Sequence, residues 1–249
     1  MSESENEPKV LANIPFLFYD VIGRTFPGGF LLLGSVLSLW YVLPIWDSFV
    51  CFLAVARVSE LSTGAATVVI GTSLLVFAII STFLGFFVLS PLSNLLVEKL
   101  WSRCAPLTLE GMGEFLGTDN LPFLLTQFKI QFGSEPSDES LNRSSFLCAY
   151  FIWKVNPSLG VMQGRYDADL LAAQSTVLAS LILFVGTLIE RFRLGPDQFL
   201  TLWLAVLGTT VVGSFLAFEY QRKKRVYGRF GMFLALSNSP HEELAHGKT

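Results

Sequence analysis

The chain has 249 residues, of which 52% are hydrophobic and 15% are charged. An average soluble protein is about 45–50% apolar and about 25% charged, so a simple soluble globule of this size is disfavoured. The composition also excludes a disordered or collagen-like chain, and its three cysteines exclude a disulfide-dense secreted one. A formal net charge of −3 shows no bulk basic excess for nucleic acid.

Four stretches without Asp, Glu, Lys or Arg reach the length of a membrane span. They are residues 25–46, 61–97, 170–189 and 198–218. A helix that crosses a hydrocarbon core of about 30 Å needs about 20 mostly apolar residues, and helices satisfy their own backbone groups there. We therefore expect an all-α integral membrane protein with four transmembrane helices. In the second stretch we place the span at residues 68–89, with a break or kink at Ser90 and Pro91.

The basic residues indicate the orientation. Most of the 17 Lys and Arg residues precede the first expected span, lie between spans two and three, or follow span four. The positive-inside rule therefore predicts that both termini face the cytoplasm. The acidic start lacks the basic region of a signal peptide, so the first span is expected to stay in the mature protein as an anchor.

The spans divide the chain into five expected segments. These are a cytoplasmic or interfacial N-terminal segment (1–24), a transmembrane hairpin of spans one and two (25–90), a helical cytoplasmic insert (91–169), a transmembrane hairpin of spans three and four (170–218) and a basic cytoplasmic tail (219–249). Small and hydroxyl residues four apart, such as Thr176 with Ser180 and Thr210 with Ser214, favour close packing within the second hairpin.

Inside the insert, amphipathic patterns predict helices at residues 92–104, 121–132 and 141–155, and a further stretch from 158 that continues into span three. Ser137 or Asp138 is expected to cap the 141–155 helix, after a turn at 133–138. The glycines between 111 and 117 are interpreted as a flexible turn. The aromatic residues around 146–153 are interpreted as packing.

The motifs of common enzyme sites are missing. There is no Walker A or GxGxxG sequence, and the glycines at 111, 113 and 117 have the wrong spacing for a dinucleotide loop. The only histidines, His241 and His246, do not match HExxH, and no Ser or Cys has an evident histidine base. We therefore expect a protein that is not an enzyme and holds no metal or cofactor. Intramembrane chemistry with Asp20, Arg24 or Arg165 remains the alternative.

The entry to the first span combines charges with helix-loosening residues. Asp20 and Arg24 are four apart and would pair on one helical face, and Pro27 and Gly28 follow. The simpler interpretation is an interfacial helix at the membrane boundary. The alternative is a hinge that links a cytoplasmic sensor to movement of the span, which makes these four residues candidate gating residues.

Polar residues in the second span are candidate pore residues. Ser73 and Ser81 lie on similar sides of a helix, although isolated hydroxyls more often bond their own backbone. No charged residue lies in the middle of any expected span, which disfavours an ion-coupled carrier. Four spans are too few to enclose a pore, so a homo-oligomer would have to supply one.

Five basic residues are candidate ligand-binding residues, because aromatic side chains that can stack on bases are interleaved with them. They are Lys99, Arg103, Arg143, Lys154 and Arg165. A soluble anion such as a nucleotide or oligonucleotide would bind them, and scattered surface charge is the simpler interpretation. The basic run at 222–225, directly after span four, is interpreted as a contact with membrane lipids and a topology signal.

The layout resembles the small transmembrane effectors of bacterial antiphage systems of the Hailong type. The resemblance rests on the FYDVIGR sequence from Phe18 to Arg24, followed by Pro27 and Gly28, and on four spans with a helical insert. It implies a multi-pass protein of the bacterial inner membrane, and a tetrameric channel held closed by a single-stranded DNA oligomer. It also implies a cytoplasmic nucleotidyltransferase partner that makes this oligomer.

Together these features favour an oligomeric membrane effector, a ligand-gated channel or pore that depolarises the bacterial membrane when a cytoplasmic signal changes. The alternative is a non-conducting membrane scaffold or accessory subunit that recruits a soluble enzyme through residues 91–165.

Overall fold

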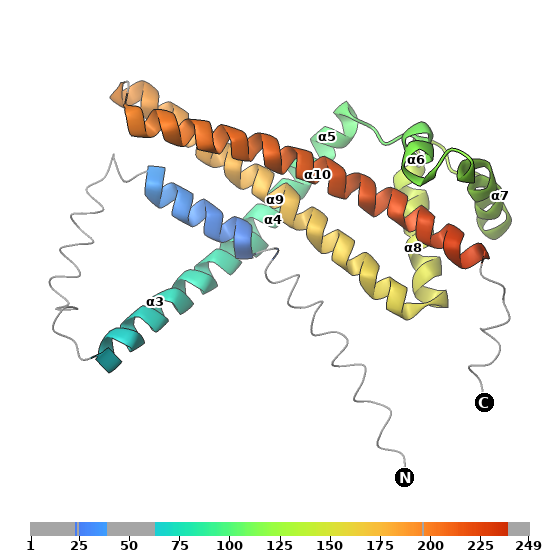
Figure 1. Ribbon diagram of the computed structural model, residues 1–249, viewed down its shortest axis with the longest axis horizontal. Coiled ribbons are helices and arrows are strands. Elements are labelled where there is room, and N and C mark those ends of the chain that lie inside the picture. The colour runs from blue at the N-terminus through green and yellow to red at the C-terminus, as the bar shows by residue number, and fades with distance from the viewer. Residues whose placement is uncertain (1–22, 24, 39–62, 196, 239–249) are drawn as a thin grey trace, which may run out of the picture. The chain divides into compact units, whose positions relative to one another are not determined.

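The computed structural model describes residues 23, 25–38, 63–195 and 197–238, and every regular element among them is a helix (Figure 1). In chain order these elements are a helix Thr25–Ser38, α3 (Thr63–Phe83), α4 (Ser90–Ser93), α5 (Lys99–Cys104), α6 (Leu109–Leu116), α7 (Asn120–Phe132), α8 (Leu141–Val155), α9 (Pro157–Leu194) and α10 (Gln198–Asn238). Two π-helical segments, Leu84–Leu89 and Asn94–Glu98, flank α4.

Three helices in the described part of the chain are long and apolar enough to cross a membrane: Gly71–Cys104, Pro157–Leu194 and Gln198–Asn238. This confirms a helical protein with helices that could span a membrane. The expected first span begins with the shorter apolar helix Thr25–Ser38, and the rest of residues 25–46 lies outside the described residues. A total of four spans therefore stays a prediction.

Of the break or kink expected at Ser90 and Pro91, the break is wrong, because the chain stays helical from Thr63 to Cys104. Proline removes one backbone donor and crowds the preceding turn. The π-helical segment before α4 accommodates it: the backbone N–H of Ser90 donates to the carbonyl of Gly85, five residues earlier. The region expected as a separate amphipathic helix at 92–104 therefore continues the second span.

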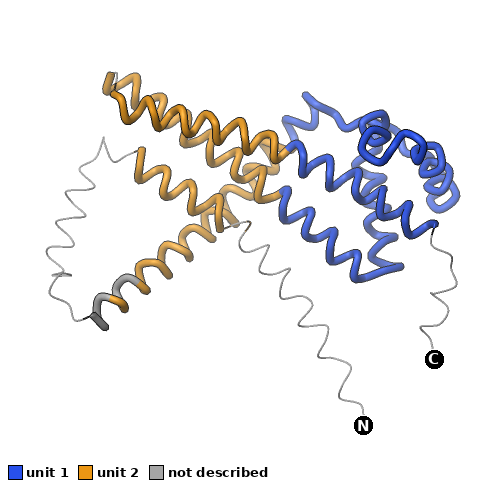
Figure 2. Tube along the Cα trace, viewed as in Figure 1, with its two compact units in different colours: residues 1–17, 99–170, 219–249 blue, residues 18–98, 171–218 orange. Residues whose placement is uncertain are grey.

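The chain divides into two compact units (Figure 2). Unit 1 comprises residues 1–17, 99–170 and 219–249, and unit 2 comprises residues 18–98 and 171–218. Both α9 and α10 contribute to both units, since α9 passes from unit 1 into unit 2 and α10 returns. The uncharged stretch 198–218 ends where unit 2 ends, so unit 2 collects the apolar parts of these helices.

Unit 2 is held together by small residues and hydroxyl groups between its helices. Ser180 Oγ and Ser214 Oγ lie 3.3 Å apart, which confirms the hairpin of α9 and α10 expected from their spacing. Ser38 Oγ lies 2.8 Å from Thr187 Oγ1 and accepts a hydrogen bond from Trp203 Nε1 at 3.1 Å. In a membrane such bonds replace the water that hydrocarbon cannot supply.

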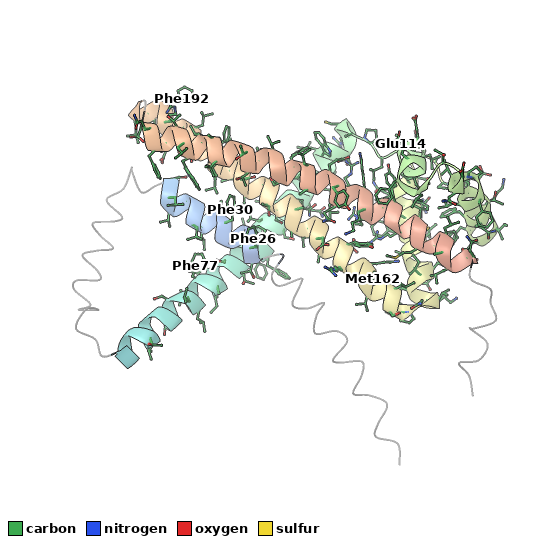
Figure 3. All side chains as sticks on the ribbon, in the orientation of Figure 1. Phe26, Phe30, Phe77, Glu114, Met162 and Phe192 are labelled. Carbon is green, nitrogen blue, oxygen red and sulfur yellow. The ribbon has the colours of Figure 1, made fainter. Side chains whose placement is uncertain are left out.

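Large apolar side chains cover the outside of unit 2. On α3 and the turn that follows it, Leu75, Ile79, Phe83 and Phe87 are exposed and line a shallow apolar groove. At the far end of α9, Phe192 stands out from its helix (Figure 3). In water such a surface would favour aggregation, whereas lipid chains cover it without cost.

Unit 1 has its own aromatic core, and the second half of α10 supplies the centre of it. The fully buried side chains come from α6, α7, α8 and α10 and include Met112, Leu124, Phe128, Cys148, Ile152, Val226, Phe230 and Phe233. Residues 219–238 were expected as part of a basic tail, but they continue α10 as a core helix. Apolar residues at 226, 230 and 233 recur at helical spacing, which explains the continuation.

The predicted helices of the insert are largely confirmed. The 141–155 prediction coincides with α8, the 121–132 prediction matches α7, and the stretch from 158 is the first part of α9. Two details need correction. Gly111 and Gly113 lie within α6 rather than in a turn. Of the two residues expected to cap α8, Asp138 instead accepts a hydrogen bond from the backbone N–H of Leu109 at the start of α6, whereas Ser137 Oγ accepts one from the backbone N–H of Ser140, the N-cap residue of α8.

Gly28 marks the closest approach between the helix Thr25–Ser38 and α3. A Cβ atom at Gly28 would clash with the backbone carbonyl oxygen of Ser81, whereas one at Gly29 would lie 3.5 Å from the flexible Ser81 hydroxyl.

The substitution Gly28→Ala is therefore expected to destabilise the protein by about 1–3 kcal/mol, because the backbone of one of the two helices must move to make room for the new methyl group. Gly29→Ala, the matched control, is expected to be neutral or slightly stabilising. Unfolding by denaturing detergent measures both, and equal effects would contradict the tight crossing.

Candidate functional site

The five predicted ligand-binding residues all lie in unit 1 and all are exposed. They are distributed over three helices: Lys99 and Arg103 on α5, Arg143 and Lys154 on α8, and Arg165 on α9. Exposed side chains on three helices make a charged surface and not an enclosed pocket.

The predicted gating residues lie in different surroundings. Asp20 and Arg24 lie outside the described residues. Pro27 and Gly28 are buried in unit 2, where Gly28 packs against α3. On α3, Ser73 is exposed and Ser81 is buried, with no hydrogen-bond partner for its Oγ atom. The structure therefore does not place the two serines in one shared environment.

A cluster of arginines on α10 was missed as a site. The Arg222 side chain is only 2% exposed, and its guanidinium donates to the backbone carbonyl of Ala105 at 2.6 Å and to Glu219 at 3.2 Å. Trp101 Nε1 donates to the same Glu219 carboxylate at 2.8 Å. A buried guanidinium needs this combination of a counter-charge and further acceptors. Arg222 therefore fastens α10 to α5 and the segment after it.

Seven residues further along α10, Arg229 makes a second buried ion pair. Its side chain is 3% exposed, and its Nη2 atom donates to both carboxylate oxygens of Asp167 on α9, at 2.9 and 2.8 Å. Arg225 Nη1 lies 3.9 Å from the same carboxylate. One carboxylate thus lies against two guanidinium groups. Asp167 is 47% exposed, so the pair reaches solvent on the aspartate side only.

The rest of the Arg229 guanidinium lies against apolar and unreactive groups. The ring of Phe146 on α8 covers it, with 5.0 Å between Cζ and the ring centroid, and its Nε and Nη1 atoms are buried without a hydrogen-bond partner. Burial lowers the pKa of Arg229, and Asp167 partly offsets this effect. Burial also raises the pKa of the nearby Cys148 thiol, which makes this cysteine a weak nucleophile.

Next to this cluster, α8 exposes an aromatic face. Phe146, Tyr150 and Trp153 are exposed and recur at helical spacing. The expectation that the aromatics around 146–153 serve as packing holds for Phe151, whose ring contacts Phe132 and Phe233. The exposed aromatics lie on the same helix as the predicted ligand residues Arg143 and Lys154.

The interpretation of residues 222–225 as a lipid contact is wrong for Arg222, which is buried within unit 1, and Arg225 lies beside Asp167. Lys223 and Lys224 keep more exposure: Lys223 lies 3.7 Å from Glu219, and Lys224 lies over the ring of Tyr166. The signal that could have revealed this is the spacing of Arg222, Arg225 and Arg229, which places all three on one face of a helix.

Comparison with protein-family models, with curated proteins and with solved structures found no match. In the parts of the chain that the structure describes, no group of three or more His, Cys, Asp or Glu residues is placed to hold a metal ion. Among the described residues, unit 1 shows exposed Lys and Arg side chains together with exposed aromatic side chains on α8.

Removing the buried charge of Arg222 tests whether it fastens unit 1. Arg222→Gln leaves Glu219 without its closest cation and the Ala105 carbonyl without its donor, so we expect a loss of about 2–4 kcal/mol in the free energy of unfolding. Lys223→Gln removes an equal charge from the same carboxylate at an exposed position and should cost less than about 0.5 kcal/mol. Denaturant unfolding in detergent measures both, and similar costs would contradict the role of Arg222.

Proposed function

We propose that this protein is an oligomeric effector of the bacterial inner membrane, a ligand-gated channel or pore that depolarises the membrane in antiphage defence. A nucleotide or oligonucleotide on the cytoplasmic side gates it. The observation that carries the proposal is that α9 and α10 both run without interruption from the charged unit 1 into the apolar unit 2.

Helix continuity matters because a hydrogen-bonded helix transmits displacement along its length, whereas a flexible linker absorbs it. Ligand binding changes an equilibrium only through contacts that differ between two states. Unit 1 offers exposed cations and aromatics for such contacts, and unit 2 offers the apolar helices for a membrane response. Signalling through two shared helices is the simplest use of this arrangement.

The remaining parts of the proposal follow from charge and size. With N- and C-termini in the cytoplasm, the basic residues of unit 1 face the cytoplasmic ligand. Since one chain has too few spans to enclose a pore, a homo-oligomer surrounds it, and a tetramer is favoured by the resemblance to Hailong-type effectors. A cytoplasmic nucleotidyltransferase would supply the ligand, and membrane lipids cover the apolar outer surface.

The proposal can be tested by reconstituting the purified protein into liposomes and following their membrane potential with a potential-sensitive dye. We expect the protein to collapse an imposed potassium potential, and a single-stranded DNA oligomer or a nucleotide to change the rate. Liposomes that keep their potential with and without these probes would contradict channel function.

A pair of glycine substitutions in the same liposomes tests the shared helices. Leu216→Gly with Ala217→Gly loosens α10 at the boundary between the units, and Ala205→Gly with Val206→Gly loosens it by a similar amount, about 1 kcal/mol per glycine, within unit 2. All four positions are exposed. We expect the boundary pair alone to weaken the response to the probe while leaving binding intact.

The alternative is a non-conducting scaffold or accessory subunit that recruits a soluble enzyme. The exposed aromatic face of α8 favours it, because Phe146, Tyr150 and Trp153 have the chemistry of a protein-binding surface. Liposomes that stay sealed, together with an intact fold of unit 1, would favour this alternative over a channel.

A further inference from the structure

We infer that Asp167 occupies an anion site formed by Arg225 and Arg229, and that a phosphate group of a ligand takes its place. The inference rests on the proposed function, because it names the chemistry that unit 1 would recognise. Its starting point is the unequal exposure of the ion pair: the cation is enclosed, and the carboxylate is half open to solvent.

The first step in the argument is that the site has unused donors. Arg229 has five N–H groups, and Asp167 engages only its Nη2 atom. Its Nε and Nη1 atoms are buried and have no hydrogen-bond partner among the residues that the structure describes, and the side chain is only 3% exposed. Gln163, one turn before Asp167 on α9, also holds a buried Nε2 atom without a partner. Buried donors are rarely left unsatisfied in proteins, so we expect an acceptor to bind at these three atoms.

The second step is the charge. Two guanidinium groups, those of Arg225 and Arg229, lie against the one carboxylate of Asp167. A phosphate carries up to two negative charges and more acceptor oxygens than a carboxylate, so it can accept more hydrogen bonds from the two guanidinium groups. Arginine binds phosphate through two parallel N–H donors, whereas Asp167 engages only the Nη2 atom of Arg229.

The third step is access. Because the carboxylate of Asp167 is half exposed, a rotation of its side chain towards solvent frees the Arg229 edge that it now covers, without moving the helix. The ring of Phe146 closes the other side of the guanidinium and is itself exposed, so a ligand held at the arginines also meets the aromatic face of α8. Phosphate on arginine next to an exposed ring is the pattern of nucleotide and headgroup recognition.

Binding of ³²P-labelled inorganic phosphate to the full-length protein in lipid-free detergent tests the inference. Asp167→Asn keeps the shape of the side chain but removes the competing charge, so we expect the dissociation constant to fall about tenfold. Asp169→Asn removes the same charge from a different face of α9 and should leave it unchanged. Tightening in neither variant, or equal tightening in both, would overturn the inference.

Removing the arginines should weaken phosphate binding. Arg229→Gln in the Asp167→Asn background should abolish the gain, and Arg225→Gln, at a less buried position, does the same if Arg229→Gln fails to fold. Persistent tight binding in a folded variant would contradict the site.

Two competition arms then identify the source of the phosphate: displacement of the label by phosphatidylglycerol indicates a lipid headgroup, and displacement by ATP indicates a soluble ligand. Both arms are independent of conductance. If the protein binds phosphate as described but leaves liposomes sealed, the proposed function is wrong and the phosphate site stands. If it conducts but does not bind phosphate, the proposed function stands and the site is wrong.

Discussion

The enclosure of charged arginine side chains on α10 is the constraint on which unit 1 depends. Removing a guanidinium from water costs several kcal/mol, so each buried arginine must be matched by acceptors from other parts of the chain. Arg222 draws Glu219, Ala105 and, through Glu219, Trp101 into one network, and Arg229 draws Asp167 from α9. These contacts determine which segments surround the second half of α10. The aromatic core of Phe128, Phe230 and Phe233 then fills the space they define.

Unit 2 follows a different rule. Its outer surface is apolar, so hydrophobic burial gives its helices little reason to associate in lipid. Contact comes instead from close backbone approach at Gly28 and from hydroxyl pairs such as Ser180 with Ser214. The same two helices, α9 and α10, thus pack through small and hydroxyl residues in unit 2 and through a buried aromatic core in unit 1. Under the proposed function, this division lets the two helices carry a signal between the units.

Much of this was readable from the sequence, and the errors have two causes. The length of the uncharged stretches predicted the helices that can cross a membrane, and the periodicity of apolar residues predicted the bounds of α8. Both signals are local properties of the sequence, so they can be read without the tertiary fold. The break expected at Pro91 failed because π-helical turns restored the hydrogen bonding. Arg222 was interpreted as a lipid contact because its partner Ala105, and Trp101 which shares Glu219 with it, are more than a hundred residues away. Local composition identifies a charge, but only the tertiary fold shows whether that charge faces water or another chain segment.

The central claim is that a ligand on unit 1 changes the permeability of unit 2, and recording from a planar bilayer tests it most directly. With the protein inserted in one orientation, a single-stranded DNA oligomer is added first to the side that carries the C-terminus and then, in a separate recording, to the other side. The account predicts unitary currents whose open probability changes only when the oligomer is added on the C-terminal side. The absence of unitary currents, or the same response from both sides, would contradict it.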